Sequence, residues 1–130
     1  MRPTGWYDRV LLPVLIDLAC GSAHLRRLRE EIVPKAHGDV LEVGIGTGRN
    51  LPFYDRSRVR SIVGVEPSLR MHRLALRRSQ EAGLALSLVG LTAERLPVDD
   101  ARFDCVVCTF TLCSIPDPLP ALREMRRALV

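Results

Sequence analysis

The sequence predicts an α/β fold: a doubly wound parallel sheet between two layers of helices, three layers in all. Four short apolar runs alternate with helical patterns, and this alternation is typical of βαβ units around a parallel sheet. The runs are apolar on both faces, as a sheet covered on both sides requires. A glycine-rich turn directly follows the first run, at the carboxyl end where open parallel sheets bind their ligands.

An N-terminal helical segment, residues 1–37, is expected to precede the sheet as a lid or cap. Residues 1–20 suggest short helical pieces that Pro13 interrupts. Leu25–Val33 is predicted to be an amphipathic helix, because apolar residues recur in it at helical spacing. The charged side chains on its other face, Arg29 among them, are interpreted as a solvated surface.

The strands and helices predicted for residues 38–130 follow in order. The strand candidates are Val40–Val43, Ser61–Val65, Leu84–Val89 and Asp104–Phe110. One helix is expected after Ser68, a good N-cap, and another after Asp117, with Pro118 at its first position. The apolar face of this last helix is predicted to consist of Leu122, Met125 and Leu129.

The composition excludes several function classes. The 130 residues suffice for about one domain, and 47% hydrophobic with 26% charged residues is an ordinary globular balance. No apolar run approaches the roughly 20 residues of a membrane span. The net charge is +4, but the basic residues are scattered among acidic ones, and aromatic residues make up only 5%. Without a basic stripe or a stacking surface, the composition argues against a nucleic-acid partner.

The cysteines and histidines give no sign of a metal site. Cys105 and Cys108 form a C-x-x-C pattern, which can mark a redox pair or a zinc site. On a strand, residues three apart point to opposite faces, so we predict neither a disulfide nor a shared metal. The histidines His24, His37 and His72 lack ligand spacing and are interpreted as surface residues. Free thiols fit a reducing, cytoplasmic compartment.

The strongest functional signal is the glycine-rich turn after the first predicted strand. Its glycines at every second position, Gly44, Gly46 and Gly48, let a ligand approach the backbone. A dinucleotide fingerprint has its third glycine where this sequence has Arg49, so a nicotinamide-dependent oxidoreductase is a weakened alternative that stays open. Glu42, just before the turn, suits a cationic ligand group better than a phosphate.

Two further strand-end loops carry polar residues. Glu66 ends the second predicted strand, where a carboxylate can accept hydrogen bonds from both hydroxyls of a ribose. The alternative interpretation is that Glu66 serves only as a capping partner for the helix that follows. The segment 92–104 follows the third strand and is expected to frame an adenine, with an ordinary polar loop as the alternative.

These motifs together resemble a class I S-adenosylmethionine-dependent methyltransferase of the methyltransferase type 11 kind. The resemblance rests on Glu42-x-Gly44-x-Gly46-x-Gly48, Val65-Glu66-Pro67-Ser68, Ala93-Glu94-x-Leu96-Pro97 and Phe103-Asp104-x-Val106-Val107. It covers nearly the whole chain and implies a Rossmann-like fold. Residues 1–37 would then form the lid, and residues 38–130 would form the cofactor-binding half-domain.

The resemblance implies that the cofactor contacts come from the lid, the strand-end loops and the fourth strand. The implied residues are Tyr7, Glu42, Gly44, Gly46, Gly48, Asn50, Glu66, Pro67, Thr92, Ala93, Glu94 and Thr109.

Individual roles follow from the family pattern. The glycines would line the methionine and ribose portion, Glu42 would hold the amino group and Glu66 the ribose. Thr92 stands where the family usually has an aspartate for the adenine, so that contact departs from the pattern. Thr109 would lie near the sulfonium. Tyr7 would close over the cofactor, with a packing tyrosine as the alternative.

The implied reaction moves a methyl group from S-adenosylmethionine to a small-molecule or lipid-like acceptor by in-line displacement, leaving S-adenosylhomocysteine. No catalytic base is identified. Core packing is the preferred interpretation of the apolar segment 6–18, with contact to an apolar acceptor or a membrane surface as the alternative.

The resemblance also implies that the C-terminal strands of the family should follow Val130. Without them, Asp104–Phe110 would be an edge strand, which invites self-association. A truncated, non-catalytic cofactor-binding module therefore stays open as an alternative to an active enzyme.

Overall fold

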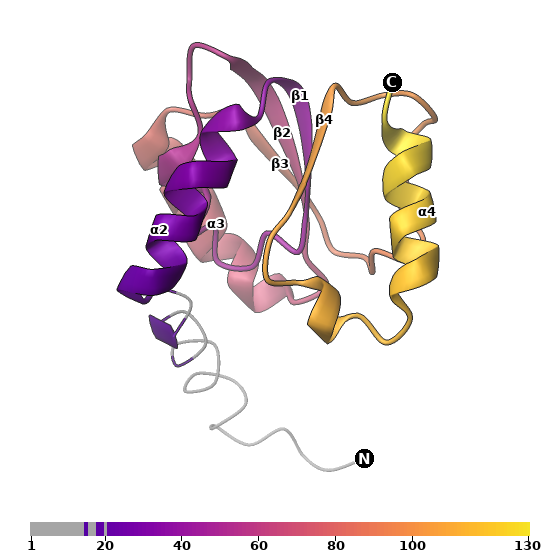
Figure 1. The fold of residues 1–130 in the computed structure, drawn as a ribbon, viewed down its shortest axis with the longest axis horizontal. Helices are drawn as coiled ribbons and strands as arrows, with labels where there is room; N and C mark the ends of the chain where they lie inside the picture. The colour runs from indigo at the N-terminus through magenta and orange to yellow at the C-terminus, as the bar shows by residue number, and fades with distance from the viewer. Residues whose placement is uncertain (1–14, 16–17, 20) are drawn as a thin grey trace.

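A four-stranded parallel sheet forms the centre of the molecule (Figure 1). The computed structural model describes residues 15, 18–19 and 21–130. The strands lie in the spatial order β3-β2-β1-β4, with bounds β1 Gly38–Val43, β2 Val59–Val65, β3 Leu86–Val89 and β4 Cys105–Cys108. All neighbouring pairs are parallel.

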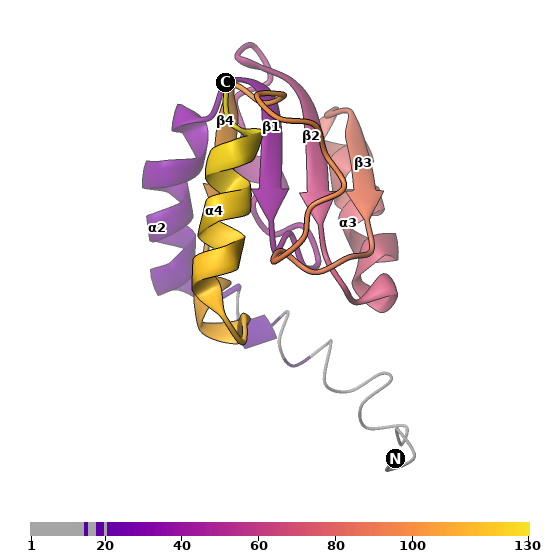
Figure 2. The same ribbon diagram turned by 90° about the vertical axis from the view of Figure 1, so that its right-hand side faces the viewer.

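Helices cover both faces of this sheet. Two helices lie against one face and one against the other (Figures 1 and 2): α2 Ala23–Ile32 with α3 Leu69–Ala82, and α4 Pro118–Ala128. The predicted α/β fold with a doubly wound parallel sheet in three layers is confirmed. None of the helices within the described ranges has the length and apolar content that crossing a bilayer demands.

The strand ends differ from the prediction for local reasons. β1 begins at Gly38, ahead of the apolar run, because the Gly38 N–H still donates to the carbonyl of Arg58 at 2.8 Å beside β2. β4 ends at Cys108, before the predicted Phe110. Phe110 has φ 54°, which turns the chain out of the extended conformation.

Two hydrophobic clusters fill the spaces on either side of the sheet. The cluster under α2 and α3 contains Val40 and Ile62, and the cluster under α4 contains Phe103. Cys105 packs against the first cluster and Cys108 against the second. The prediction that these two thiols point to opposite faces is therefore confirmed.

The predicted solvated position of Arg29 on α2 was wrong. Only 5% of Arg29 is exposed. Its Nε donates to Asn50 Oδ1 at 2.9 Å, and its guanidinium lies 4.9 Å from the centre of the Phe110 ring. These two partners, which are distant in sequence, hold the guanidinium inside the protein through a hydrogen bond and a cation–π contact.

The predicted apolar face of α4 was wrong in part. The helix turns Ala121, Met125 and Ala128 toward the sheet, and these residues are buried. Leu122 is 45% exposed on α4, and Leu129, which lies beyond the end of the helix in an extended conformation, is 37% exposed.

The two predicted helix starts differ in their capping. Asp117 Oδ1 accepts the Leu119 N–H at 3.2 Å, with Pro118 at the first helical position, as predicted. Ser68 occupies the N-cap position of α3, but its side chain makes no capping hydrogen bond. Instead, Glu66 Oε1 accepts the Ser68 N–H at 2.9 Å.

Phe103→Ala is expected to destabilise the chain severely. Phe103 is 1% exposed within the α4-side cluster, and removing a buried phenylalanine ring costs about 3–5 kcal/mol. Urea unfolding followed by circular dichroism measures the change. Leu119→Ala is the control, because Leu119 is 60% exposed on α4 and should change stability by about 0.5 kcal/mol at most. Equal losses from both variants would contradict this core assignment.

Candidate functional site

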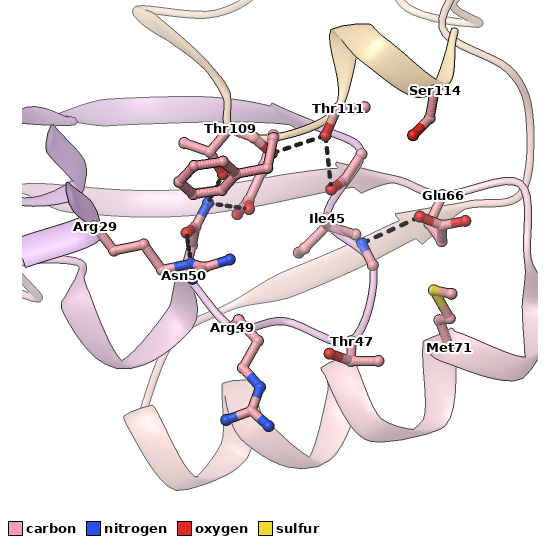
Figure 3. A pocket seen from close by; sticks show the side chains of 14 residues that line it. Arg29, Ile45, Thr47, Arg49, Asn50, Glu66, Met71, Thr109, Thr111 and Ser114 are labelled. Atoms are coloured by element: carbon pink, nitrogen blue, oxygen red, sulfur yellow. Dashed lines mark hydrogen bonds between the residues drawn. The ribbon is translucent and has the colours of Figure 1, made fainter. Parts of the chain in front are cut away.

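A cavity of about 260 Å³ lies at the carboxyl ends of β1, β2 and β4 (Figure 3). Its walls come from the glycine-rich turn, from the residues that follow β2 and β4, and from α2 and α3. Six of the predicted cofactor-binding residues line it: Glu42, Gly44, Gly46, Asn50, Glu66 and Thr109. The fold therefore gathers residues from three separate motifs at one place.

The glycines of the turn have two different surroundings. Gly46 has φ +58°, and the nearest atom to a Cβ added there is Met71 Sδ at 3.9 Å, so its backbone is open to the cavity. Gly48 does not line the cavity. A Cβ on Gly48 would lie 2.7 Å from Leu51 Cδ1 and 3.0 Å from Ala75 Cα. Gly48 therefore lets α3 pack closely against the turn.

Glu42 is the centre of a buried hydrogen-bond network. The residue is 1% exposed at the end of β1. Asn50 Nδ2 donates to Glu42 Oε1 at 2.7 Å, and the Tyr54 hydroxyl donates to Glu42 Oε2 at 2.8 Å. The same Asn50 amide donates to Thr109 Oγ1 at 2.8 Å and accepts from Arg29. The network thus joins β1, the turn, α2 and the end of β4.

Burial raises the pKa of Glu42 to about 7. The hydrogen bonds from Tyr54 and Asn50 and the nearby Arg29 guanidinium oppose this rise without cancelling it. Burial, followed by the adjacent Glu42 carboxyl, also raises the pKa of the Tyr54 hydroxyl. Glu42 consequently changes charge near neutral pH.

Glu66 uses both carboxylate oxygens at the end of β2. Oε2 accepts the Gly46 N–H at 3.2 Å, while Oε1 accepts the Ser68 N–H at the start of α3. The helix-cap contact proposed as an alternative is therefore present, and the carboxylate also faces the cavity. His72 contacts the same strand end, since its Nε2 lies 2.8 Å from the Glu66 carbonyl oxygen. The His72 side chain is half-buried there, so its predicted surface position holds only in part, whereas the predicted exposure of His24 and His37 is confirmed.

The remaining predicted residues lie apart from this cavity. Thr92 lines a second cavity of about 560 Å³ at the end of β3. Ala93 is buried and Glu94 half-buried, and neither of them lines the two cavities. Pro67 is exposed beside Glu66. Tyr7 lies outside the described residues.

Several residues that line the first cavity were not predicted as site residues. They are Arg29, Ile45, Thr47, Arg49, Met71, Phe110, Thr111 and Ser114. Thr111 Oγ1 lies 2.9 Å from the Thr109 carbonyl oxygen and 3.4 Å from the Gly44 carbonyl oxygen, so the segment after β4 contacts the start of the turn. Thr47 lies between two of the predicted glycines and Arg49 directly follows the last one, so the turn motif could have indicated both as site residues. Arg29 was predicted to lie on a solvated helix face, and Met71 comes from the apolar stripe of α3, so neither residue had a signal for a site.

The fold and the cavity define a class of protein. A cavity at the carboxyl ends of parallel strands, with a bare glycine backbone and a carboxylate on the next strand, is the arrangement of an α/β domain that binds a nucleotide-type cofactor. Among the described residues, no group of three potential metal ligands clusters in space. The chain belongs to the methyltransferase-domain family, whose model matches residues 41–130.

Known relatives are similar over most of this chain. The chain is 31% identical over 122 residues to the mitochondrial methyltransferase OMS1 of Saccharomyces cerevisiae, covering 81% of this chain and 26% of that protein. It is 38% identical over 92 residues to the phosphatidylethanolamine N-methyltransferase of Cereibacter sphaeroides, covering 69% of this chain and 44% of that protein. The chain therefore spans less than half the length of these curated relatives.

Solved structures support the fold assignment. The crystal structure of a SAM-dependent methyltransferase from Aquifex aeolicus superposes with a TM-score of 0.71 at 21% identity. The match covers 90% of this chain and 66% of that one. At this identity the likeness establishes the Rossmann-like fold.

Glu42→Gln is expected to remove one contribution to the pH dependence of stability. The folded-state pKa of about 7 lies above the ordinary value of 4.5, so this residue's contribution is fully present below pH 4.5. As the pH rises from 4.5 through 7, the unfolded state releases its proton first and this contribution is lost. The loss is on the order of 3 kcal/mol.

Urea unfolding of both chains between about pH 4.5 and pH 8 measures this difference. Wild-type stability should fall relative to that of the glutamine variant across this range. The variant retains partners, because its amide oxygen can accept from Asn50 and its NH₂ can donate to the Tyr54 oxygen. A stability difference that does not change with pH would contradict the raised pKa.

Proposed function

We propose that this chain binds S-adenosylmethionine and takes part in transferring its methyl group to a small-molecule or lipid-like acceptor. The main observation that supports the proposal is that Gly46 and Glu66 line the same cavity. Gly46 offers open backbone, and the Glu66 carboxylate stands beside it at the next strand end. The family membership supports the identity of the cofactor.

The cavity residues fit the chemical groups of this cofactor. The Glu66 carboxylate can accept hydrogen bonds from the two ribose hydroxyls in exchange for those that it now accepts from the Gly46 and Ser68 N–H groups. The turn around Gly44 and Gly46 would hold the methionine portion, with the acidic Glu42 behind it. The cavity at the end of β3, which Thr92 and Leu96 line, offers space for the adenine.

The chain's contribution to the reaction is placement. The bound cofactor supplies an activated methyl group, so the protein must orient the acceptor and exclude water. Thr109 and Phe110 follow β4 and line the cavity, where they would border the transferred group. In the described lining of this cavity, the side chains that could accept a proton are the carboxylates of Glu42 and Glu66.

The acceptor class is proposed from the name of one relative. The relative from Cereibacter sphaeroides is named for a phospholipid acceptor, which supports a lipid-like molecule here. A lipid acceptor would require contact with a membrane surface. The apolar segment 6–18, for which such contact was an alternative, lies almost entirely outside the described residues.

Glu66→Ala is expected to weaken S-adenosylhomocysteine binding by about tenfold or more, since hydrogen bonds to a charged group are worth about 1.5–3 kcal/mol. Isothermal titration calorimetry measures the affinity. Glu81→Ala is the matched control, because Glu81 is an exposed carboxylate on α3 that pairs with Arg77. Unchanged affinity in the Glu66 variant would contradict the ribose assignment.

The same calorimetry separates the alternative functions. NADH is titrated in parallel, and binding of NADH in place of S-adenosylhomocysteine would favour the oxidoreductase. Binding of S-adenosylhomocysteine without methylation across a broad acceptor panel would favour a non-catalytic module.

We also propose that the outer edge of β4 mediates self-association. In the described part of the chain, β4 pairs with β1 alone. The unpaired N–H and C=O groups of an edge strand favour pairing with another chain. Sedimentation equilibrium at increasing concentration should show mass above that of the monomer. A monodisperse, stable monomer throughout would contradict the proposal.

A further inference from the structure

Four arginines from three separate elements line one cavity beside the first. Arg26 and Arg29 come from α2, Arg49 comes from the glycine-rich turn and Arg78 from α3. We call this space of about 280 Å³ the arginine cavity. Its other described lining residues are uncharged: Gly21, Pro52 and Phe53. A concentration of guanidinium groups in one hollow favours an anionic ligand there.

Arg29 and Arg78 are held in place by hydrogen bonds to residues of the glycine-rich turn. Arg29 is 5% exposed, and its Nε donates to Asn50 Oδ1. Arg78 Nη1 donates to the Thr47 carbonyl at 2.8 Å. Both guanidiniums are therefore held in place by hydrogen bonds to the protein, which lowers the conformational cost of binding a ligand.

Arg26 and Arg49 are the other two arginines in the wall of the arginine cavity. Arg26 lies 5.9 Å from the centre of the Phe53 ring, and its Nε is 3.0 Å from Glu30, an exposed residue outside the cavity lining. The Arg49 guanidinium lies 2.9–3.0 Å from where a Cβ on Gly21 would be. The absence of a side chain at Gly21 thus makes room for the Arg49 fork.

The arginine cavity adjoins the proposed transfer site. Arg29 and Arg49 line both the arginine cavity and the cavity of the glycine-rich turn. Figure 3 shows both arginines beside the turn, with Arg29 reaching toward Asn50. A molecule anchored among the arginines would therefore extend toward Thr109 and Phe110.

We infer that the arginine cavity binds the phosphate group of a phosphate-carrying methyl acceptor. Guanidinium forks match phosphate oxygens in geometry as well as in charge, and several forks can share one phosphate. This inference rests on the proposed methyl transfer and narrows its acceptor to phosphorylated molecules. A soluble phosphomonoester and a lipid headgroup share this phosphate chemistry, and the vesicle experiment below distinguishes the two.

The test is a binding titration of the full chain with inorganic phosphate. The double variant Arg26→Ala/Arg78→Ala should bind phosphate at least about tenfold more weakly than the wild type. Arg27→Ala/Arg77→Ala is the matched control. It changes the adjacent residues on the same two helices, removes the same charge and lies outside the cavity lining. Its affinity should stay within about twofold of the wild type.

Three results would overturn the inference. They are no saturable phosphate binding by the wild type, equal losses in both double variants, and an unchanged affinity in the Arg26/Arg78 variant. Thermal unfolding of each variant checks the fold. Arg26→Lys/Arg78→Lys keeps both charges but loses the forks, so several-fold weaker binding is expected even if the alanine variant is unstable.

A vesicle experiment distinguishes the two phosphate sources. Cosedimentation with phosphatidylglycerol vesicles that inorganic phosphate displaces would assign the cavity to a lipid headgroup. Binding of O-phosphoethanolamine without vesicle binding would assign it to a soluble acceptor. Calorimetry with S-adenosylhomocysteine on the wild type is run beside these titrations. If that ligand fails to bind while phosphate binds, the proposed methyl transfer fails and the anion site stands.

Discussion

The burial of Glu42 is the constraint on which the rest of the site depends. A carboxylate inside a protein is costly unless it is hydrogen-bonded, so the surrounding chain must bring donors to it. Asn50 and Tyr54 supply them from the segment after the turn. The Asn50 amide then engages Arg29 of α2 and Thr109 after β4. A single buried acid thereby fixes the relative positions of a strand, a turn, a helix and the sheet edge.

The shape of the glycine-rich turn follows from this anchoring. Glu42 precedes the turn and Asn50 ends it, and the hydrogen bond between them closes the loop. The chain between them must therefore bend sharply, and its three glycines all have positive φ. Gly48 uses the missing Cβ to pack against Ala75, while Gly46 leaves its backbone open. Folding and ligand access thus depend on the same short segment.

The sequence was sufficient for those features that depend on local pattern. The alternation of apolar runs and helical stripes predicted the parallel sheet, and the residue spacing on β4 placed Cys105 and Cys108 on opposite faces. The turn, Glu66 and Thr109 were predicted because they are tied to strand ends, which meet at one edge.

The features that the sequence could not supply depend on contacts between distant segments. Arg29 looks like a solvated residue on an amphipathic helix, and only the positions of Asn50 and Phe110 show why it is buried. The left-handed conformation of Phe110 is uncommon outside glycine, and no local pattern announces it. Likewise, the four arginines of the arginine cavity are scattered over 53 positions of sequence from Arg26 to Arg78, and only the fold collects them.

The two adjoining cavities differ in the balance of charge in their linings. The cavity of the turn has two carboxyl groups, from Glu42 and Glu66, beside the guanidiniums of Arg29 and Arg49. The described lining of the arginine cavity has four guanidiniums and no carboxyl group. A cationic ligand in the first would stabilise the ionised form of Glu42 and lower its pKa from about 7. Arg29 also lowers the pKa of Glu42, so an anionic group in the arginine cavity would weaken this influence and raise that pKa. Because Arg29 contacts Asn50 and lines both cavities, the charge state of Glu42 would respond to ligands in either one.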